Sequence, residues 1–138
     1  MNDSLNTAVR HIMVTQVQTV LPGVLLGTAV DLMRDASITC LVVDLQDPSR
    51  GFGVITQKDV IGLIFDGAVD FASTTVEEVM SHPCVTLSPE WSLETAVALM
   101  RMMGVRRAPV VEAGKLQGLL SFTDVFRHVA GGAKNPGA

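Results

Sequence analysis

The chain is built from two copies of one unit of about 60 residues, which together fill nearly all of its 138 residues. Through the first part of each copy, identical residues recur 67 positions apart, as Met13 and Met80 do. A turn that is two residues shorter in the second copy changes the spacing to 65, which relates Asp59 to Asp124. An internal period constrains the fold strongly, because both copies must adopt the same supersecondary structure. Stacked copies also form paired clefts, so the repeat bears on function.

The length predicts one domain with a core that both copies share. A lone unit of about 60 residues buries only about 60% of its unfolded surface, whereas a chain near 150 residues buries roughly 70%. Hydrophobic residues make up 48% of the chain, and the mean hydropathy of +0.39 is on the apolar side for a soluble protein. We expect the first unit over residues 9–66, the second over residues 75–130 and a disordered tail over residues 131–138.

Charge and hydropathy narrow the classes of partner. The formal net charge of −4 argues against a broad nucleic-acid-binding surface. No apolar run reaches the ~18 residues that a membrane span needs. The first residues, MNDSLNTAVRH, lack the basic start and the apolar stretch of a signal peptide. We therefore expect a cytoplasmic protein with no membrane partner.

Both copies show the same order of expected elements. A short helical turn ends at Met13 or Met80, a strand follows, and a proline leads into a helix. Two strands joined by a turn come next, and a second helix closes the copy. The expected strands cover residues 17–20, 40–44, 52–55, 84–87, 107–111 and 116–120, and the expected helices cover 26–36, 58–65, 93–103 and 123–129. The fold class is thus α/β (α+β), with two β-α-β-β-α units.

Two of the expected helices are apolar nearly all round. Residues 93–103 and 60–65 contain almost continuous apolar side chains. A helix of this kind is buried on more than one side. In a chain this small, a second subunit covers that side most easily, so we predict a homodimer built on these helices. The alternative is that both sides of each helix are buried within one chain.

Each copy places a hydroxyl at the end of its last strand and a carboxylate three residues later, as Thr56 with Asp59 and Ser121 with Asp124. Such a carboxylate can accept hydrogen bonds from the two hydroxyls of a ribose, and a hydroxyl with free amides at a helix N-terminus suits a phosphate. The same spacing describes a capping box, which only starts a helix, and the chain contains it elsewhere, as at Thr75–Glu78. The spacing alone leaves both interpretations open.

Two adjacent arginines, Arg106 and Arg107, directly precede an apolar strand that contains Pro109. Their guanidinium groups suit an anionic ligand. Neighbours on an extended chain point to opposite sides, so one arginine would enter a cleft while the other faces elsewhere. A solvated charged edge is the alternative. The first copy has Thr39 and Cys40 at the matching positions, so the two clefts should differ in charge.

No residue pattern indicates catalysis or a metal. The two cysteines, Cys40 and Cys84, lie in apolar runs and are expected to be buried free thiols. The three histidines are scattered, and no nucleophile stands in a recognisable pattern with a base. We therefore predict no enzyme, no catalytic residue, no metal and no required cofactor. A small enzyme that uses one of the cysteines is the least favoured alternative.

Several phrases together resemble a known family. They are HIMVTQVQTVLPG with EVMSHPCVTLSPE, and GFGVITQKDV with RRAPVVEAGKLQGLLSFTDV, where each copy ends in Gly-h-h-[Ser/Thr]-x-x-Asp. From about Val9 to Val129 the chain is similar to the CBS domain pair, or Bateman module. The resemblance implies two units related by a pseudo-twofold axis and packed through their sheets. It also implies disc-like dimers and adenosyl ligands in the clefts: AMP, ADP or ATP, with S-adenosylmethionine or NAD(H) as further candidates.

The resemblance assigns roles to residues in one cleft. Asp124 would hold a ribose, Ser121 would lie by the phosphate, and Arg106 or Arg107 would meet phosphate oxygens. The remaining residues of that cleft would be Val14, Thr39 and Cys40 from the first copy, with Ala108, Pro109 and Val110 against the adenine.

The mirror cleft would use Asp59 and Thr56, with Ser81 and the Arg106–Arg107 strand. The first copy departs from the family pattern, because its Leu41-Val42-Val43 lacks the proline before the valine that the second copy has at Pro109, and it lacks a basic residue beside that strand. This weakens the expected grip of the Asp59 cleft on a phosphate.

We expect a stand-alone regulatory module that binds an adenosyl ligand, signals by a change in the angle between its units, and regulates an enzyme or transporter. The alternative is a protein-interaction module with vacant clefts.

Overall fold

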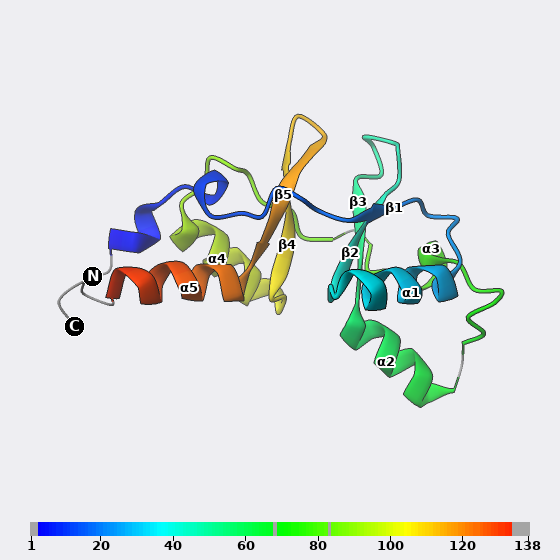
Figure 1. The fold of residues 1–138 in the computed structure, drawn as a ribbon. Coiled ribbons are helices and arrows are strands. Elements are labelled where there is room, and N and C mark those ends of the chain that lie inside the picture. Colours follow the sequence, from blue (N-terminus) through cyan, green and yellow to red (C-terminus); the bar gives the residue numbers. More distant parts are fainter. Residues whose placement is uncertain (1–2, 68, 83, 134–138) are drawn as a thin grey trace. The chain divides into compact units, whose positions relative to one another are not determined.

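The computed structural model describes residues 3–67, 69–82 and 84–133 (Figure 1). Its contacts divide the chain into two compact units. The central unit is Val17–Cys84, and the outer unit combines Met1–Gln16 with Val85–Ala138. No helix among the described residues is both long and apolar enough to cross a membrane.

The central unit has a three-stranded sheet in the order β1-β2-β3. Strand β1 is parallel to β2, and β2 is antiparallel to β3. Helix α1 packs on β2 and on α2, and the short helix α3 packs on β3. The bounds are β1 Thr19–Val20, α1 Leu26–Ala36, β2 Cys40–Asp44, β3 Phe52–Thr56, α2 Gln57–Asp66 and α3 Val76–Val79.

The outer unit repeats this plan with one strand reduced. Strands β4 and β5 form an antiparallel hairpin. Where the central unit has β1, a single parallel bridge joins Leu87 to Val110. The short 3-10 helix η1 contacts both α4 and α5. The bounds are η1 Asp3–Asn6, η2 Val9–His11, α4 Leu93–Met103, β4 Arg107–Glu112, β5 Lys115–Ser121 and α5 Phe122–Ala133.

Helix α4 illustrates why these segments form helices. The hydroxyl of Ser92 accepts a hydrogen bond of 3.1 Å from the amide of Thr95, which caps the first turn. Leu93, Ala96 and Met100 recur at helical spacing and are all fully buried. The helix ends at Gly104, whose φ of 70° closes the last turn at a conformation that glycine adopts without strain. Burying a side chain the size of Leu93 stabilises the fold by about 1.5–3 kcal/mol.

The buried apolar residues form one cluster in each unit rather than the single core that the length predicted. Each cluster nevertheless draws on both copies of the repeat. Val9 belongs to the first copy but is fully buried in the cluster of the outer unit. Val76 belongs to the second copy but is fully buried in the cluster of the central unit. Neither copy therefore completes a core without its partner.

Two segments thus pack in the opposite copy, residues 9–14 and residues 76–81, and we call them the exchanged segments. Backbone hydrogen bonds hold them in place. Val14 exchanges two hydrogen bonds of 2.9 Å with Leu119 of β5. Ser81 exchanges two hydrogen bonds with Val54 of β3, of 2.8 and 3.1 Å. In each unit, the residue that follows the exchanged turn thus pairs with the free edge of the last strand.

A methionine lies over a glycine at each of these contacts. A Cβ atom added to Gly118 would lie 2.6 Å from the carbonyl oxygen of Val14 and 2.9 Å from the sulfur of Met13. A Cβ atom added to Gly53 would lie 2.3 Å from the sulfur of Met80. Gly118 is therefore required by the close approach of the Val14 backbone, whereas at Gly53 only the flexible side chain of Met80 approaches.

Most expected elements form with their predicted bounds or within a few residues of them, but two predictions were wrong. The segment 84–87 is not a strand, and only Leu87 pairs with β4. Residues 131–133 extend α5 instead of starting a disordered tail. The rest of that predicted tail, 134–138, lies outside the described residues.

We predict that Gly118→Ala lowers the free energy of unfolding by about 1–3 kcal/mol, since the added methyl group must displace the backbone of Val14. The matched control is Gly62→Ala in α2, where an added Cβ meets nothing within 4 Å. Alanine should stabilise that helix by up to about 1 kcal/mol. Urea unfolding of both variants measures the difference, and equal shifts would contradict the close-packing argument.

Candidate functional site

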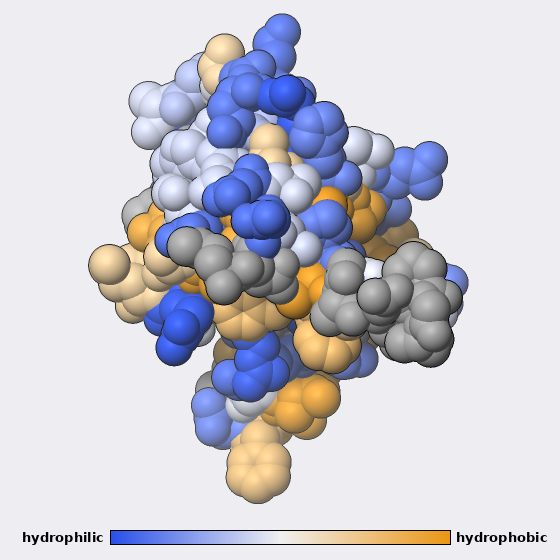
Figure 2. Space-filling model, turned by 90° about the vertical axis from the view of Figure 1, so that its left-hand side faces the viewer, coloured by the Kyte–Doolittle hydropathy of each residue, from blue (hydrophilic) through white to orange (hydrophobic). Residues whose placement is uncertain are grey.

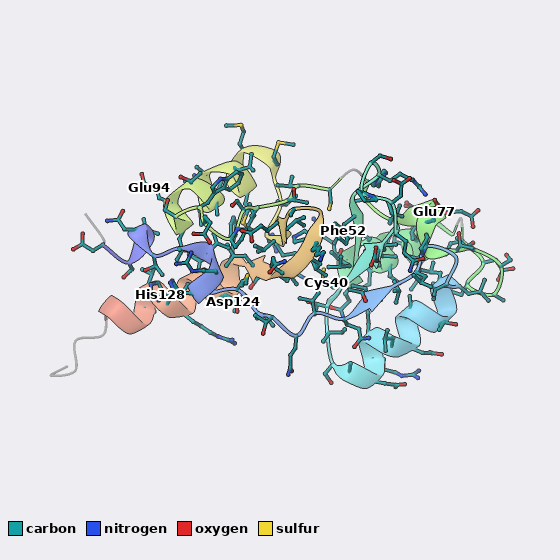
Figure 3. All side chains as sticks on the ribbon, turned by 90° about the horizontal axis from the view of Figure 1, so that it is seen from above. Cys40, Phe52, Glu77, Glu94, Asp124 and His128 are labelled. Carbon is teal, nitrogen blue, oxygen red and sulfur yellow. The ribbon has the colours of Figure 1, made fainter. Side chains whose placement is uncertain are left out.

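The Ser121–Asp124 junction lies where β5 passes into α5, and Asp124 is labelled there in Figure 3. The Ser121 hydroxyl donates a hydrogen bond of 2.7 Å to Oδ2 of Asp124. The Asp124 amide donates to the Ser121 hydroxyl oxygen over 3.2 Å, and the Ser121 amide reaches Oδ2 over 3.3 Å. The two residues therefore form a capping box, as the spacing predicted.

The central unit builds the same box where β3 passes into α2. The Thr56 amide donates to Oδ2 of Asp59 over 2.9 Å, and the Asp59 amide donates to the Thr56 hydroxyl over 3.1 Å. Among the described residues, Oδ1 of neither aspartate accepts a hydrogen bond. Capping thus occupies one oxygen of each carboxylate and leaves the other for a hydroxyl of a ligand.

The strand register decides which arginine shares a face with this junction. Arg107 of β4 pairs directly with Ser121 of β5, so their side chains lie on the same face of the hairpin. The next pair, Ala108 and Leu120, belongs to the buried cluster and defines the opposite face. Arg107 and Ser121 therefore share the face away from the core.

Arg106 lies just before β4 and plays a different part. Its carbonyl oxygen accepts a hydrogen bond of 2.8 Å from the amide of Phe122, which ties the start of α5 to the strand. Its side chain is exposed, whereas that of Arg107 is half-buried. The two adjacent arginines thus occupy unequal environments.

The central unit has no cation at the equivalent place. Cys40 of β2 pairs with Thr56 of β3, as Arg107 pairs with Ser121. The carbonyl oxygen of Thr39 accepts a hydrogen bond of 2.8 Å from the amide of Gln57. This backbone hydrogen bond is equivalent to the one between Arg106 and Phe122 in the outer unit. The buried Cys40 thiol replaces the guanidinium group, which makes the junctions alike in backbone and different in charge.

The exchanged segments lie along the strands that lead to these junctions. Val14 pairs with Leu119, two residues before Ser121, and its side chain is 45% exposed. Ser81 pairs with Val54, two residues before Thr56, and is exposed. Sequence reasoning missed Leu119 and Val54 as partners, although the repeated glycines directly before them are a signal of close backbone approach.

The predicted site residues fall into two groups. The outer unit contains Val14, Arg106, Arg107, Ala108, Pro109, Ser121 and Asp124. Of these, Ala108 is fully buried in the core, on the face opposite Arg107 and Ser121. The central unit brings together Thr39, Cys40, Thr56, Asp59 and Ser81. Each predicted cleft draws residues from both groups, so the composition of the clefts stays a prediction.

The cysteines are unlike catalytic thiols. Neither forms a disulfide, Cys40 is buried, and the Cys84 thiol donates a hydrogen bond of 3.1 Å to the carbonyl oxygen of Phe52. Burial raises the pKa of Cys84 to about 11. A nucleophilic cysteine needs a lowered pKa and access to solvent. Among the described residues no group of histidines, cysteines and carboxylates is arranged to hold a metal ion.

The family model of the CBS domain matches the chain twice, over residues 9–66 and 76–131. The chain is a CBS domain protein. The first match includes Asp59 and the second includes Asp124, so both strand-to-helix junctions are part of the CBS pattern. The fold predicted from the resemblance is confirmed by the solved structures below.

Known proteins of this family are similar over most of the chain. The CBS domain-containing protein YhcV of Bacillus subtilis is 33% identical over 119 residues, which cover 86% of this chain and 83% of YhcV. A CBS-domain protein of Burkholderia ambifaria, described as a putative signal-transduction protein, has a TM-score of 0.82 at 26% identity, covering 96% of this chain and 100% of the other. A hexameric CBS-CP12 protein of bloom-forming cyanobacteria has a TM-score of 0.81 at 28% identity, and the match covers 87% of this chain and 66% of the other.

Two more distant CBS pairs share the fold and contain adenosyl compounds. CBSX2 in complex with AMP has a TM-score of 0.76 at 24% identity, over 92% of this chain and 98% of the other. The CBS pair of MJ0100 in complex with methylthioadenosine and S-adenosylmethionine has a TM-score of 0.75 at 20% identity, over 88% and 98%. These ligands belong to those proteins.

We predict that Cys84 is nearly inert toward iodoacetamide at pH 8, because a pKa of about 11 leaves only about one thiol in a thousand ionised. Alkylation should accelerate as the pH rises toward 11 and should become fast in urea. The raised pKa also implies that the contribution of this thiol to stability is complete below pH 9 and declines as the pH rises through about 11. Peptide mass spectrometry after timed alkylation measures the rate, and fast native labelling at pH 8 would contradict the prediction.

Proposed function

We propose that this CBS pair is a regulatory module that binds an adenosyl compound at Asp124. The observation that carries the proposal is the arrangement of Ser121, Asp124 and Arg107 at the end of the β4–β5 hairpin. Asp124 has one carboxylate oxygen left for ribose hydroxyls, and Arg107 shares the face of Ser121, where a phosphate would be neutralised. AMP, ADP or ATP fits this set best.

The capping box starts the helix, and it also supports the role of Asp124 in ligand binding. It fixes the Asp124 carboxylate at the first turn of α5, where the helix dipole favours an anionic ligand group nearby. A side chain that is already held loses little freedom when a ligand binds. The AMP and S-adenosylmethionine complexes of related CBS pairs add support, since those proteins share the fold.

The proposed site at Asp59 is weaker. It has the same hydroxyl and carboxylate, but a buried thiol stands in place of the arginine. A compound with less negative charge, such as S-adenosylmethionine, suits it better than ATP. We propose that Ser81 and the Arg106–Arg107 strand complete it, and that Val14, Thr39 and Cys40 complete the Asp124 cleft.

Regulation would follow from unequal affinity. A ligand shifts the equilibrium between two inter-unit angles only by the difference in its affinity for them. We propose that a homodimer carries this signal to an enzyme or transporter in the cytoplasm, where cysteines outside disulfides, such as Cys40 and Cys84, stay reduced.

The second candidate function is an interaction module that needs no ligand. It is favoured by the exposed apolar side chains on the helices, such as Phe65, which is 90% exposed. In that case the capping boxes would have only their structural role.

We predict that AMP, ADP or ATP at about 100 times its dissociation constant stabilises the protein by roughly 2.7 kcal/mol. For a chain of this size, that is a rise of several degrees in Tm. The measurement is differential scanning fluorimetry with these nucleotides, S-adenosylmethionine and NADH. No response to any compound at millimolar concentration would overturn the nucleotide proposal and favour the interaction module.

Asp124→Ala should abolish most of that response, with the loss of a capping carboxylate costing about 1 kcal/mol of stability. The matched control is Glu78→Ala, because Glu78 accepts hydrogen bonds from the amide and hydroxyl of Thr75 in a third capping box. This control should lose similar stability and keep the full response. If Asp124→Ala loses only stability and binds the nucleotide as before, Asp124 is a helix cap and nothing more.

The adjacent arginines allow a test of the phosphate contact. Arg107→Gln should weaken ATP about tenfold or more while leaving adenosine nearly unchanged, because a charged hydrogen bond contributes about 1.5–3 kcal/mol. Arg106→Gln removes the same charge one residue away and should have a smaller effect. Isothermal titration of both variants with adenosine, AMP and ATP gives the comparison, and a larger loss in Arg106→Gln would reverse the assignment.

A further inference from the structure

The backbone does not distinguish the two docking sites where the exchanged segments bind, one in each unit. In the outer unit, the amide of Val9 donates a hydrogen bond of 2.8 Å to the carbonyl oxygen of Trp91. In the central unit, the amide of Val76 donates one of 2.8 Å to the carbonyl oxygen of Val24. The two donors occupy equivalent positions of the repeat, and so do the two acceptors. Either segment would therefore satisfy the backbone of either docking site.

The apolar contacts are interchangeable as well. The fully buried residue is a valine in both segments, Val9 and Val76, and the residue over the strand glycine is a methionine in both, Met13 and Met80.

The chain is also long enough for a non-exchanged arrangement, in which each segment docks on its own copy. Five residues lead from Val14 to Thr19 of β1. They span up to about 17 Å, whereas three strand spacings, from a segment docked on the edge of β3 to β1, add up to about 14 Å. A feature other than backbone, apolar contacts or reach must therefore select the exchanged arrangement.

The charged side chains of the two segments differ. Arg10 and Glu77 occupy equivalent positions of the repeat and have opposite charges. Arg10 forms an ion pair with Glu90, and the carboxylate of Glu112 attracts it as well. Glu77 forms an ion pair of 2.7 Å with Arg50 of the turn between β2 and β3. Each segment thus carries the charge that its docking site attracts.

In the non-exchanged arrangement, Arg10 would lose both carboxylates. It would lie beside Arg50, and like charges at this distance repel each other. The central unit has the uncharged residues Gly23 and Leu45 where the outer unit has its two carboxylates. The acid of the nearby turn, Asp47, already accepts two hydrogen bonds from within the turn. The central docking site therefore disfavours the first segment.

Glu77 would meet repulsion in the same way. In the outer docking site it would lie beside Glu90 and Glu112, with Lys115 of the turn between β4 and β5 as the cation equivalent to Arg50. Two carboxylates against one ammonium group leave an excess of negative charge there. The outer docking site therefore disfavours the second segment.

The ion pairs lie at the surface. The side chains of Arg50 and Glu77 are each 42% exposed, and those of Arg10 and Glu90 are 46% and 61% exposed. Figure 2 shows mainly hydrophilic side chains over the upper part of the face that it presents, at the height of the β4–β5 turn in Figure 1. A single exposed ion pair contributes little to stability. Here the two arrangements share their backbone and apolar contacts, so the change from attraction to repulsion at both docking sites decides between them.

We propose that the opposite charges of Arg10 and Glu77 direct each exchanged segment to the docking site of the other copy. The repeat makes the two segments interchangeable in shape, and this reversal of charge makes them unequal. The role holds whether or not the module binds a ligand, because neither residue belongs to the proposed ligand site.

The choice of docking site is tested with three introduced cysteines in one chain, in a background with Cys40→Ala and Cys84→Ala. Val14→Cys can form a disulfide with Leu119→Cys, its partner in the exchanged arrangement, or with Val54→Cys, its partner in the alternative. Residues paired in this way have Cα atoms about 5.5 Å apart, within the range of a disulfide. The chain is refolded at low salt in a glutathione buffer that equilibrates disulfides, and peptide mass spectrometry gives the ratio of the two bonds.

With the native charges, the disulfide to residue 119 should exceed the one to residue 54 at least tenfold. Arg10→Glu combined with Glu77→Arg should lower that ratio at least tenfold. Adding Glu90→Arg and Arg50→Glu, which reverses the charges of the docking sites, should restore most of it. All three chains have the same net charge, so the comparison reports the positions of the charges.

The matched control is Lys58→Glu combined with Asp66→Lys, which reverses two exposed charges on α2 and should leave the ratio unchanged. If the chain with Arg10→Glu and Glu77→Arg does not fold, Arg10→Glu alone is compared and should lower the ratio less. An unchanged ratio when the segment charges are reversed overturns the proposal. An equal decrease in the α2 control also overturns it, because the effect would then not depend on the docking sites.

Discussion

The structure depends on two backbone pairings that cross between the copies of the repeat. Val14 closes the free edge of β5 at Leu119, and Ser81 closes the free edge of β3 at Val54. Each pairing brings one fully buried valine, Val9 or Val76, into the core of the opposite copy. A single copy would lack both the segment that pairs with the edge of its last strand and part of its core. This reciprocal exchange explains how units of about 60 residues, marginal by themselves, fold as a pair.

The exchange also positions the candidate site. The pairing at Leu119 lies two residues before Ser121, so the segment that completes the outer unit runs beside the strand that presents the hydroxyl and carboxylate. Gly118 allows that approach, since any side chain there would meet the backbone of Val14. Helix capping and ligand binding use different oxygens of Asp124, so one residue can serve both.

Departures from the repeat carry more functional information than its identities. Cys40 and Arg107 occupy equivalent strand positions, opposite Thr56 and Ser121, yet one is a buried thiol and the other a cation. Asp35 and Met102 are equivalent on the helices, yet one is an acid and the other an exposed apolar side chain. Divergence of the two copies thus produces unlike sites and unlike helix surfaces on one backbone plan.

The sequence by itself determined the repeat, the two strand-to-helix junctions and the bounds of α1, α4 and β2. These depend on local patterns: apolar spacing, Ser or Thr caps, and glycine or proline at turns. It could not show that Val9 and Val76 pack in the opposite copy, or that Arg107 rather than Arg106 shares the face of Ser121. It also predicted a strand at 84–87, where only Leu87 pairs. Those features depend on contacts between residues distant in sequence and on strand register, which local propensity does not encode.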